Sequence, residues 1–206
     1  VPICPQSALY PEALARSLAY SESGFQTALD NLGAQDLDLD GTLEFGGRRY
    51  TVEFIVCSDS GVKVSIARMI ASTLRGFGFD INLRELGYDD YVKALKNGNY
   101  DMYYAEVRLC ADWDLSYILG SGADLNYGNY RDTTLDGYIR DVLANPAEQQ
   151  AQKAEELCTY LSQCAPITPI CFEKTEVLYH RGVLSGLDPT QDNIFHNMQN
   201  WTADMN

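Results

Sequence analysis

The chain has 206 residues, of which 46% are hydrophobic and 21% are charged, a composition that is typical of a globular protein and excludes a disordered or collagen-like one. Fifteen basic residues against 29 acidic ones give a net charge of −14. This charge repels phosphate backbones and anionic lipid, and so argues against binding to nucleic acid or to a membrane surface.

The first quarter of the chain combines irregular segments with short regular elements. Residues 1–20 carry three prolines and form a predicted irregular lead-in, with one short helical stretch near residues 11–19. Ser21 or Ser23 can cap the next helix, which ends at a glycine. After an acidic loop, a Gly-Gly turn predicts a β-hairpin over about residues 43–50.

Strand and helix patterns alternate in the next segment. Nearly all residues of 50–57 are apolar, β-branched or aromatic, as in a strand that is buried on both faces. The periodicity then predicts a helix over 62–77 and a second strand over 79–83. A second helix over 88–98 and a third strand over 100–109 follow. Strands separated by helices over such short distances pair in parallel through crossovers. The predicted fold class is therefore α/β.

Two further helices are predicted in the second half. The first contains Leu135 and Val142 and stops before Pro146, and the second, rich in alanine, ends at Pro166. An extended run over 167–179 and an irregular tail complete the chain.

The six cysteines form no C-x-x-C pair. Cys158 and Cys164 lie on one predicted helix, about 9 Å apart along its axis, so they cannot bridge each other. Two alternatives stay open: small buried thiols, which we favour, or one or more disulfides.

Metal and cofactor sites are not predicted. Asp36, Asp38 and Asp40 match the first half of an EF-hand loop, but the twelfth position, where a bidentate glutamate belongs, is Gly47. An acidic turn that leads into the hairpin is therefore favoured over a calcium site. The two histidines lack the spacing of zinc ligands, and common catalytic motifs and nucleotide-binding loops do not occur.

One segment has a geometric reason to be functional. Residues 110–114 follow the predicted strand 100–109, and ligands of parallel sheets bind beyond the carboxyl ends of the strands. The carboxylate of Asp112 beside an indole could pair with a ligand ammonium group. The alternative is that Asp112 or Asp114 caps the following helix, and spacing alone favours neither interpretation.

Six segments match the motifs of one protein family in the same order: Ala28–Gly33 with Asp38–Glu44, Phe77–Ile81, Asn97–Asp101, Cys110–Asp114, Asn126–Tyr130 with Asp136, and Ala165–Ile170. Among them, Cys110–Asp114 is similar to an element written "ADYN" or "ADPD". Together they resemble the bacterial extracellular solute-binding proteins of the peptide and nickel ABC importers, the oligopeptide- and dipeptide-binding group. The likeness runs from about Pro5 to Trp201.

The resemblance implies a periplasmic-binding-protein-like fold of type II, with a mostly parallel or mixed sheet flanked by helices. Residues 1–206 would form a single α/β lobe, the second of two, and the tail 180–206 would return toward the first lobe, which this chain lacks. In that family two lobes close over an extended ligand, and an aspartate of the "ADY" element holds the free amino group of a peptide. That role falls on Asp112.

Further expectations follow from the same resemblance. Trp113, Arg108 and Glu106 are additional candidates for contact with the ligand, and no residue is catalytic. The implied partners are a peptide or another small solute and the permease of an ABC transporter. The implied location is extracytoplasmic, with a lipoprotein anchor in a segment that this chain does not contain.

Two other functions stay open. A small α/β enzyme could use Asp112 and Glu106 as an acid–base pair, although the lack of a nucleophile motif and of a suitable histidine base argues against it. A ligand sensor or chaperone with the same fold but outside transport is the second alternative.

Overall fold

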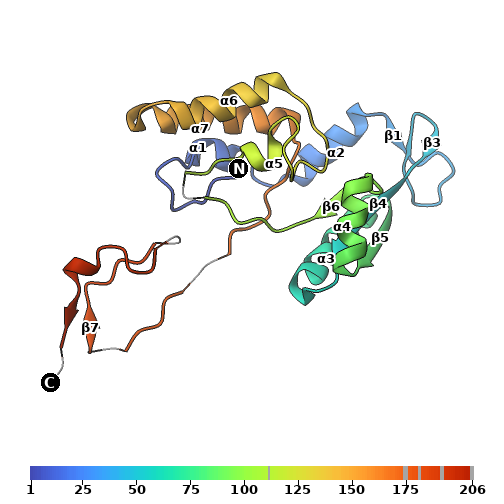
Figure 1. Ribbon diagram of the computed structural model, residues 1–206. Coiled ribbons are helices and arrows are strands. Elements are labelled where there is room, and N and C mark those ends of the chain that lie inside the picture. The colour runs from blue at the N-terminus through green and yellow to red at the C-terminus, as the bar shows by residue number, and fades with distance from the viewer. Residues whose placement is uncertain (111, 174–175, 181, 191–192, 205–206) are drawn as a thin grey trace. The chain divides into compact units, whose positions relative to one another are not determined.

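The computed structural model describes residues 1–110, 112–173, 176–180, 182–190 and 193–204 (Figure 1). These residues form two compact units, each with its own core. The sheet unit comprises Leu18–Val107 and Tyr127–Asn129. The helical unit comprises Val1–Ser17, Arg108–Asn126 and Tyr130–Asn206.

A three-stranded parallel sheet forms the centre of the sheet unit. The strand β4 (Thr51–Cys57) lies between β5 (Asp80–Leu86) and β6 (Met102–Tyr104). Its residues Phe54, Ile55 and Val56 are almost completely buried. This arrangement confirms the predicted α/β fold class and the predicted burial of the first strand on both faces.

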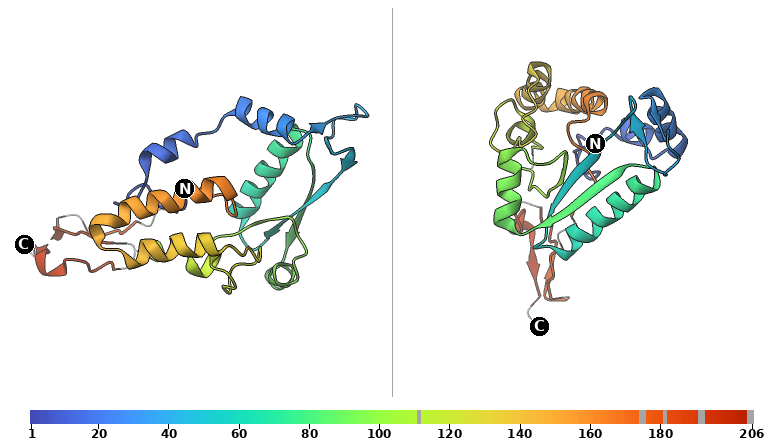
Figure 2. Two further views of the ribbon diagram at one scale, coloured as in Figure 1. Left: turned by 90° about the horizontal axis from the view of Figure 1, so that it is seen from above. Right: turned by 90° about the vertical axis from the view of Figure 1, so that its right-hand side faces the viewer.

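Two helices cover the two faces of this sheet (Figure 2). Because side chains of a strand alternate between faces, Phe54 packs in a cluster with residues of α3 (Gly61–Gly76), whereas Ile55 packs with residues of α4 (Tyr88–Asn97). The α3 helix begins after the N-cap residue Ser60. Both helices lie where the periodicity predicts them.

The sheet unit also contains a small antiparallel sheet that follows α2 (Glu22–Asn31). Its strands are β1 (Ala34–Gln35), β2 (Glu44–Phe45) and β3 (Arg48–Arg49). The turn between β2 and β3 is the predicted Gly-Gly pair, and both glycines have positive φ, of 60° and 75°, as tight hairpin turns require. The predicted hairpin is confirmed.

The α-helices of the helical unit, among the residues that the structure describes, are α1 (Glu12–Ser17), α5 (Ser116–Leu119), α6 (Thr133–Ala144) and α7 (Ala147–Cys164). Leucine, isoleucine and valine side chains form the main core between α5, α6 and α7. A second cluster packs Ile3 of the lead-in against Ala154 and Cys158 of α7. Among the described helices of both units, none is long and apolar enough to cross a membrane.

The tail of the helical unit contains two very short strands that the sequence pattern does not predict. The strand β7 (Leu184–Ser185) pairs with β8 (Thr202–Ala203) in antiparallel orientation. A short 3-10 helix, η1 (Met198–Asn200), precedes β8.

The prediction of a strand over residues 100–109 is wrong beyond Tyr104. Tyr104 pairs with Val56, and β4 itself ends one residue after Val56. An edge strand that has no partner to pair with cannot continue, whatever the β-propensity of its residues. Asp112 therefore does not directly follow the carboxyl end of a strand, and the chain enters the helical unit at Arg108.

One carboxylate connects α6 to α7. Asp132 is the N-cap residue of α6, and its side chain accepts hydrogen bonds from the N–H groups of Thr134 (2.8 Å) and Leu135 (3.2 Å). It also accepts hydrogen bonds from the hydroxyls of Tyr160 on α7 (2.6 Å) and Tyr130 (3.2 Å). The hydrogen bond from Tyr160 is the largest cause that lowers the pKa of Asp132.

Because this pKa is lowered in the folded state, the Asp132 carboxylate stabilises the fold above about pH 4, the ordinary pKa of aspartate, and the contribution is lost as the pH falls through the folded value. We expect Asp132→Ala to lower the melting temperature at pH 7 by a few degrees. Asp132→Asn should keep the cap but lose part of the acid sensitivity. Thermal melts between pH 7 and pH 2 test this, and an identical acid profile for wild type and Asp132→Asn would contradict it.

Candidate functional site

The structure divides the four predicted ligand-binding residues between the two units. Glu106 belongs to the sheet unit, whereas Arg108, Asp112 and Trp113 belong to the helical unit. Each unit therefore carries some of these candidate residues, and the two groups are described separately.

The turn before α5 separates the roles of the two aspartates. Asp114 accepts hydrogen bonds from the N–H (2.7 Å) and the hydroxyl (2.9 Å) of Ser116, the first residue of α5. Asp112 is exposed, and its carboxylate accepts a hydrogen bond of 3.2 Å from the N–H of Asp114. Asp114 thus binds the start of the helix, and the capping alternative does not apply to Asp112.

Trp113 holds this turn in place. Its φ of 58° lies in the left-handed region, which an L-residue adopts only at a cost of about 1–2 kcal/mol. The half-buried indole packs against the cluster around Ile3 and forms an edge-to-face contact with Phe172, with ring centroids 5.7 Å apart. The packing of the indole offsets the strained backbone, so the Trp113 side chain is a structural anchor for the exposed carboxylate beside it.

Glu106 forms an ion pair with Lys63, with 2.8 Å between the carboxylate oxygen and Nζ. Lys63 lies in the first turn of α3, which follows β4, and Glu106 lies two residues after β6. From β4 the chain passes through α3 to β5 on one side, whereas β6 lies on the other side. Ligands of open α/β sheets bind at such a reversal of strand order, beyond the carboxyl ends of the strands.

Lys63 is therefore a site candidate that the sequence analysis did not identify. In the sequence, Lys63 is only a basic residue in the first turn of a predicted helix. Its position next to a possible ligand site becomes recognisable only when the strand order is known. Arg108, in the other unit, has an exposed side chain, and its carbonyl accepts a hydrogen bond of 2.7 Å from the Tyr117 hydroxyl.

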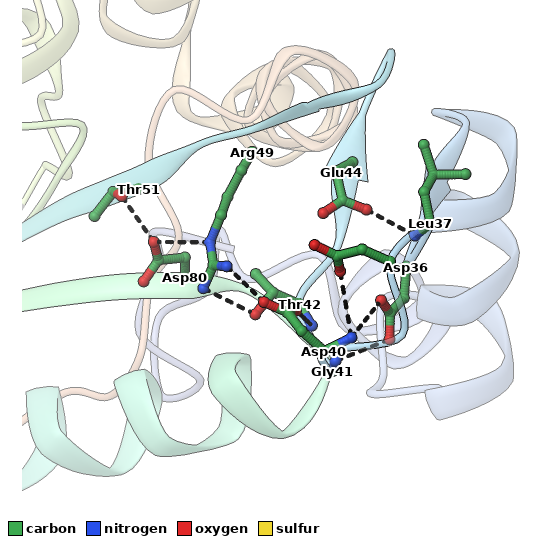
Figure 3. Close-up of polar contacts among 10 residues, drawn as sticks. Asp36, Leu37, Asp40, Gly41, Thr42, Glu44, Arg49, Thr51 and Asp80 are labelled. Atoms are coloured by element: carbon green, nitrogen blue, oxygen red, sulfur yellow. Dashed lines mark hydrogen bonds and ion pairs between the residues drawn. The ribbon is translucent and has the colours of Figure 1, made fainter.

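The acidic loop before β2 uses its carboxylates internally (Figure 3). Asp36, Asp38 and Asp40 form the one group of three or more potential metal-ligating side chains found among the described residues. Asp36 accepts hydrogen bonds from the N–H groups of Asp40 (3.1 Å) and Gly41 (2.9 Å). Asp40 accepts from the N–H of Thr42 (2.8 Å), the largest cause that lowers the pKa of Asp40.

Arg49 adds a cation to this loop. Its guanidinium lies 2.7 Å from the Asp40 carboxylate and 3.5 Å from that of Asp80 at the start of β5 (Figure 3). The acidic turn leads into the hairpin of β2 and β3, and Arg49 of the same chain supplies a positive charge beside it.

We expect calcium to leave this loop unchanged, because Asp36 and Asp40 are already hydrogen-bonded and Gly47 cannot supply the bidentate carboxylate of an EF-hand. The melting temperature should be the same, within about 1 °C, in millimolar calcium and in millimolar magnesium. An increase of several degrees in calcium alone would show that the loop binds the ion.

No protein-family model and no curated protein sequence matches the chain, but its fold matches solved structures. The oligopeptide-binding protein AppA from Bacillus subtilis, in complex with a nonapeptide, is 18% identical, with a TM-score of 0.69 over 99% of this chain and 42% of that chain. A periplasmic oligopeptide-binding protein from Thermotoga maritima, with bound mannohexaose, is 19% identical, with a TM-score of 0.71 over 91% of this chain and 37% of that chain.

A third structure, NikZ from Campylobacter jejuni in complex with Ni(L-His), is 18% identical, with a TM-score of 0.62 over 71% of this chain and 31% of that chain. This chain spans less than half the length of each of the three. Identities of this size show the fold alone. The chain therefore has the fold of the type II periplasmic binding proteins, and it corresponds to one part of the longer chains in these structures.

Proposed function

We propose that this chain is the second ligand-binding lobe of an extracytoplasmic solute-binding protein, which captures peptides or a related small solute and delivers them to the permease of an ABC transporter. The observation that carries the proposal is the match of fold to AppA, in complex with a nonapeptide, over 99% of this chain. Residues 1–206 then form one lobe, built from the sheet unit and the helical unit, and a lipoprotein segment outside this chain anchors the protein.

The segment after α7 supports the proposal that a first lobe completes this one. Among the described residues, the backbone groups of 167–173 have no hydrogen-bond partner. Exposed apolar side chains follow this segment, with Leu178 at 92% and Phe195 at 57% of full exposure. Exposed apolar side chains favour a covering partner, and an unpaired extended backbone is available to pair with one. We propose that the first lobe covers them and that the tail 180–206 returns to it.

Asp112 is the proposed partner of a ligand ammonium group. Three observations support this role: the carboxylate is exposed, its one hydrogen bond among the described residues is long, and Asp114 is the aspartate that accepts hydrogen bonds from Ser116 at the start of α5. The packed indole of Trp113 holds the turn, so a ligand would lose little binding free energy to ordering it. In the sheet unit, Glu106 lies beyond the carboxyl end of β6 and is the second proposed contact, and Arg108 is the third.

An oligosaccharide is the second candidate solute, because the Thermotoga maritima structure of the same fold holds mannohexaose. The enzyme alternative gains no support from the described residues, since Glu106 of its acid–base pair is ion-paired with Lys63. Binding without catalysis is therefore the proposed activity.

A lobe that supplies half of a cleft should bind its solute weakly by itself. We expect the isolated chain to bind peptides with a Kd above roughly 1 mM, equivalent to about −4 kcal/mol. Titration calorimetry with a set of short peptides measures this. Micromolar affinity in the isolated chain would contradict the proposal that a second lobe is needed.

In the protein that carries both lobes, Asp112→Asn should weaken the binding of peptides with a free amino group by about ten- to hundredfold, because a charge-assisted hydrogen bond contributes roughly 1.5–3 kcal/mol. Asp114→Asn is the matched control: it removes the same charge two residues away, keeps the helix cap and should leave the affinity unchanged.

N-acetylated peptides provide the second arm of this experiment. They lack the ammonium group, so they should bind poorly to the wild type and lose little affinity in Asp112→Asn. Equal affinities of wild type and Asp112→Asn for free-amino peptides would remove Asp112 from the site. Binding of oligosaccharides but not of peptides would support the proposed solute-binding role and contradict the proposal that the solute is a peptide.

A further inference from the structure

The six cysteines of the chain differ sharply in their surroundings, and all six are free in this structure. Cys158 is buried in α7, and burial raises the pKa of its thiol to about 11, which makes it unreactive. The thiol of Cys164 donates a hydrogen bond to the carbonyl of Tyr160 within the same helix. Cys57 is the only cysteine of the sheet unit.

Two of the remaining three cysteines share one hollow in the helical unit. Cys4 and Cys171 both line an open hollow of about 410 Å³ between the start of the lead-in and the extended segment 169–173. Cys171 is exposed and Cys4 is half-buried, so a small oxidant can approach both.

The chain on both sides of this hollow lies outside the helices and strands. Residues 1–6 and 169–173 form neither helix nor strand, and the Cα atoms of a disulfide must approach to within about 7 Å. Such a movement breaks no helix or sheet hydrogen bonds. Cys110, the third candidate, does not line the hollow.

We propose that Cys4 and Cys171 form a disulfide across this hollow when the protein is in an oxidising compartment, the environment that the proposed extracytoplasmic location supplies. Oxidised glutathione serves as the oxidant. The thiolate of one cysteine attacks a glutathione sulfur and releases one glutathione thiolate. The second cysteine thiolate then attacks the mixed disulfide and releases the other. Two protein thiols are oxidised and one glutathione disulfide is reduced to two thiols.

This bond would join the lead-in to the segment that carries Phe172, whose ring contacts the indole of Trp113. It would therefore restrain the packing that holds the exposed carboxylate of Asp112. A cross-link between positions so distant in sequence also removes much of the freedom of the unfolded chain.

The test is to incubate the purified chain with oxidised and reduced glutathione at pH 8, alkylate the free thiols, and map disulfides by mass spectrometry without reduction. The tryptic fragment that follows Lys153 contains Cys158, Cys164 and Cys171. A second digestion with chymotrypsin, which cleaves after Tyr160, and fragmentation of the linked peptide between Cys164 and Cys171 identify the bonded cysteine.

We expect a linked peptide that joins Cys4 to Cys171, a loss of two alkylatable thiols, and a melting temperature about 5 °C or more higher than in the reduced chain. Cys171→Ser and Cys4→Ser should each abolish the link and the shift, whereas the control Cys110→Ser should keep both. A link through Cys110, or six alkylatable thiols after oxidation, would overturn the proposal. Solute binding does not enter this measurement, so its outcome is independent of the proposed function.

Discussion

The burial of β4 on both faces is the constraint on which the rest of the sheet unit depends. Three consecutive residues, Phe54, Ile55 and Val56, are almost completely buried, which is possible only if both neighbours in the sheet and both faces are covered. The chain supplies this cover by placing β5 and β6 on opposite sides, with α3 and α4 on opposite faces. The same arrangement creates the reversal of strand order where Lys63 and Glu106 meet.

The sequence could predict those elements whose determinants are local. The α3 helix has its capping serine and its apolar period within one stretch of chain, and the hairpin after the acidic loop has two adjacent glycines that tolerate positive φ. The end of β6 could not be predicted, because it depends on where its partner β4 stops. The same holds for Lys63, since its position gains significance only from the order of the strands.

In the candidate site, too, the features that the sequence could not predict depend on contacts seen only in the structure. Sequence spacing could not decide between Asp112 and Asp114 as the helix cap, because both precede α5 closely, and only the hydrogen bonds of Ser116 distinguish them. The role of Trp113 as an anchor depends on contacts with Ile3 and Phe172, each more than fifty residues away in sequence. Resemblance to a family suggested the aspartate, whereas only the packing of Trp113 shows what holds the neighbouring backbone.

The cluster that joins Ile3 to Ala154 and Cys158 has a consequence for the order of events during synthesis. All strands of the parallel sheet and both of its helices have left the ribosome before α7 is made, so the sheet unit can collapse early. The lead-in, although synthesised before the sheet unit, must wait for a partner about 150 residues later. Its apolar side chains therefore stay available to chaperones until α7 has been made, and the helical unit can become complete only after that point.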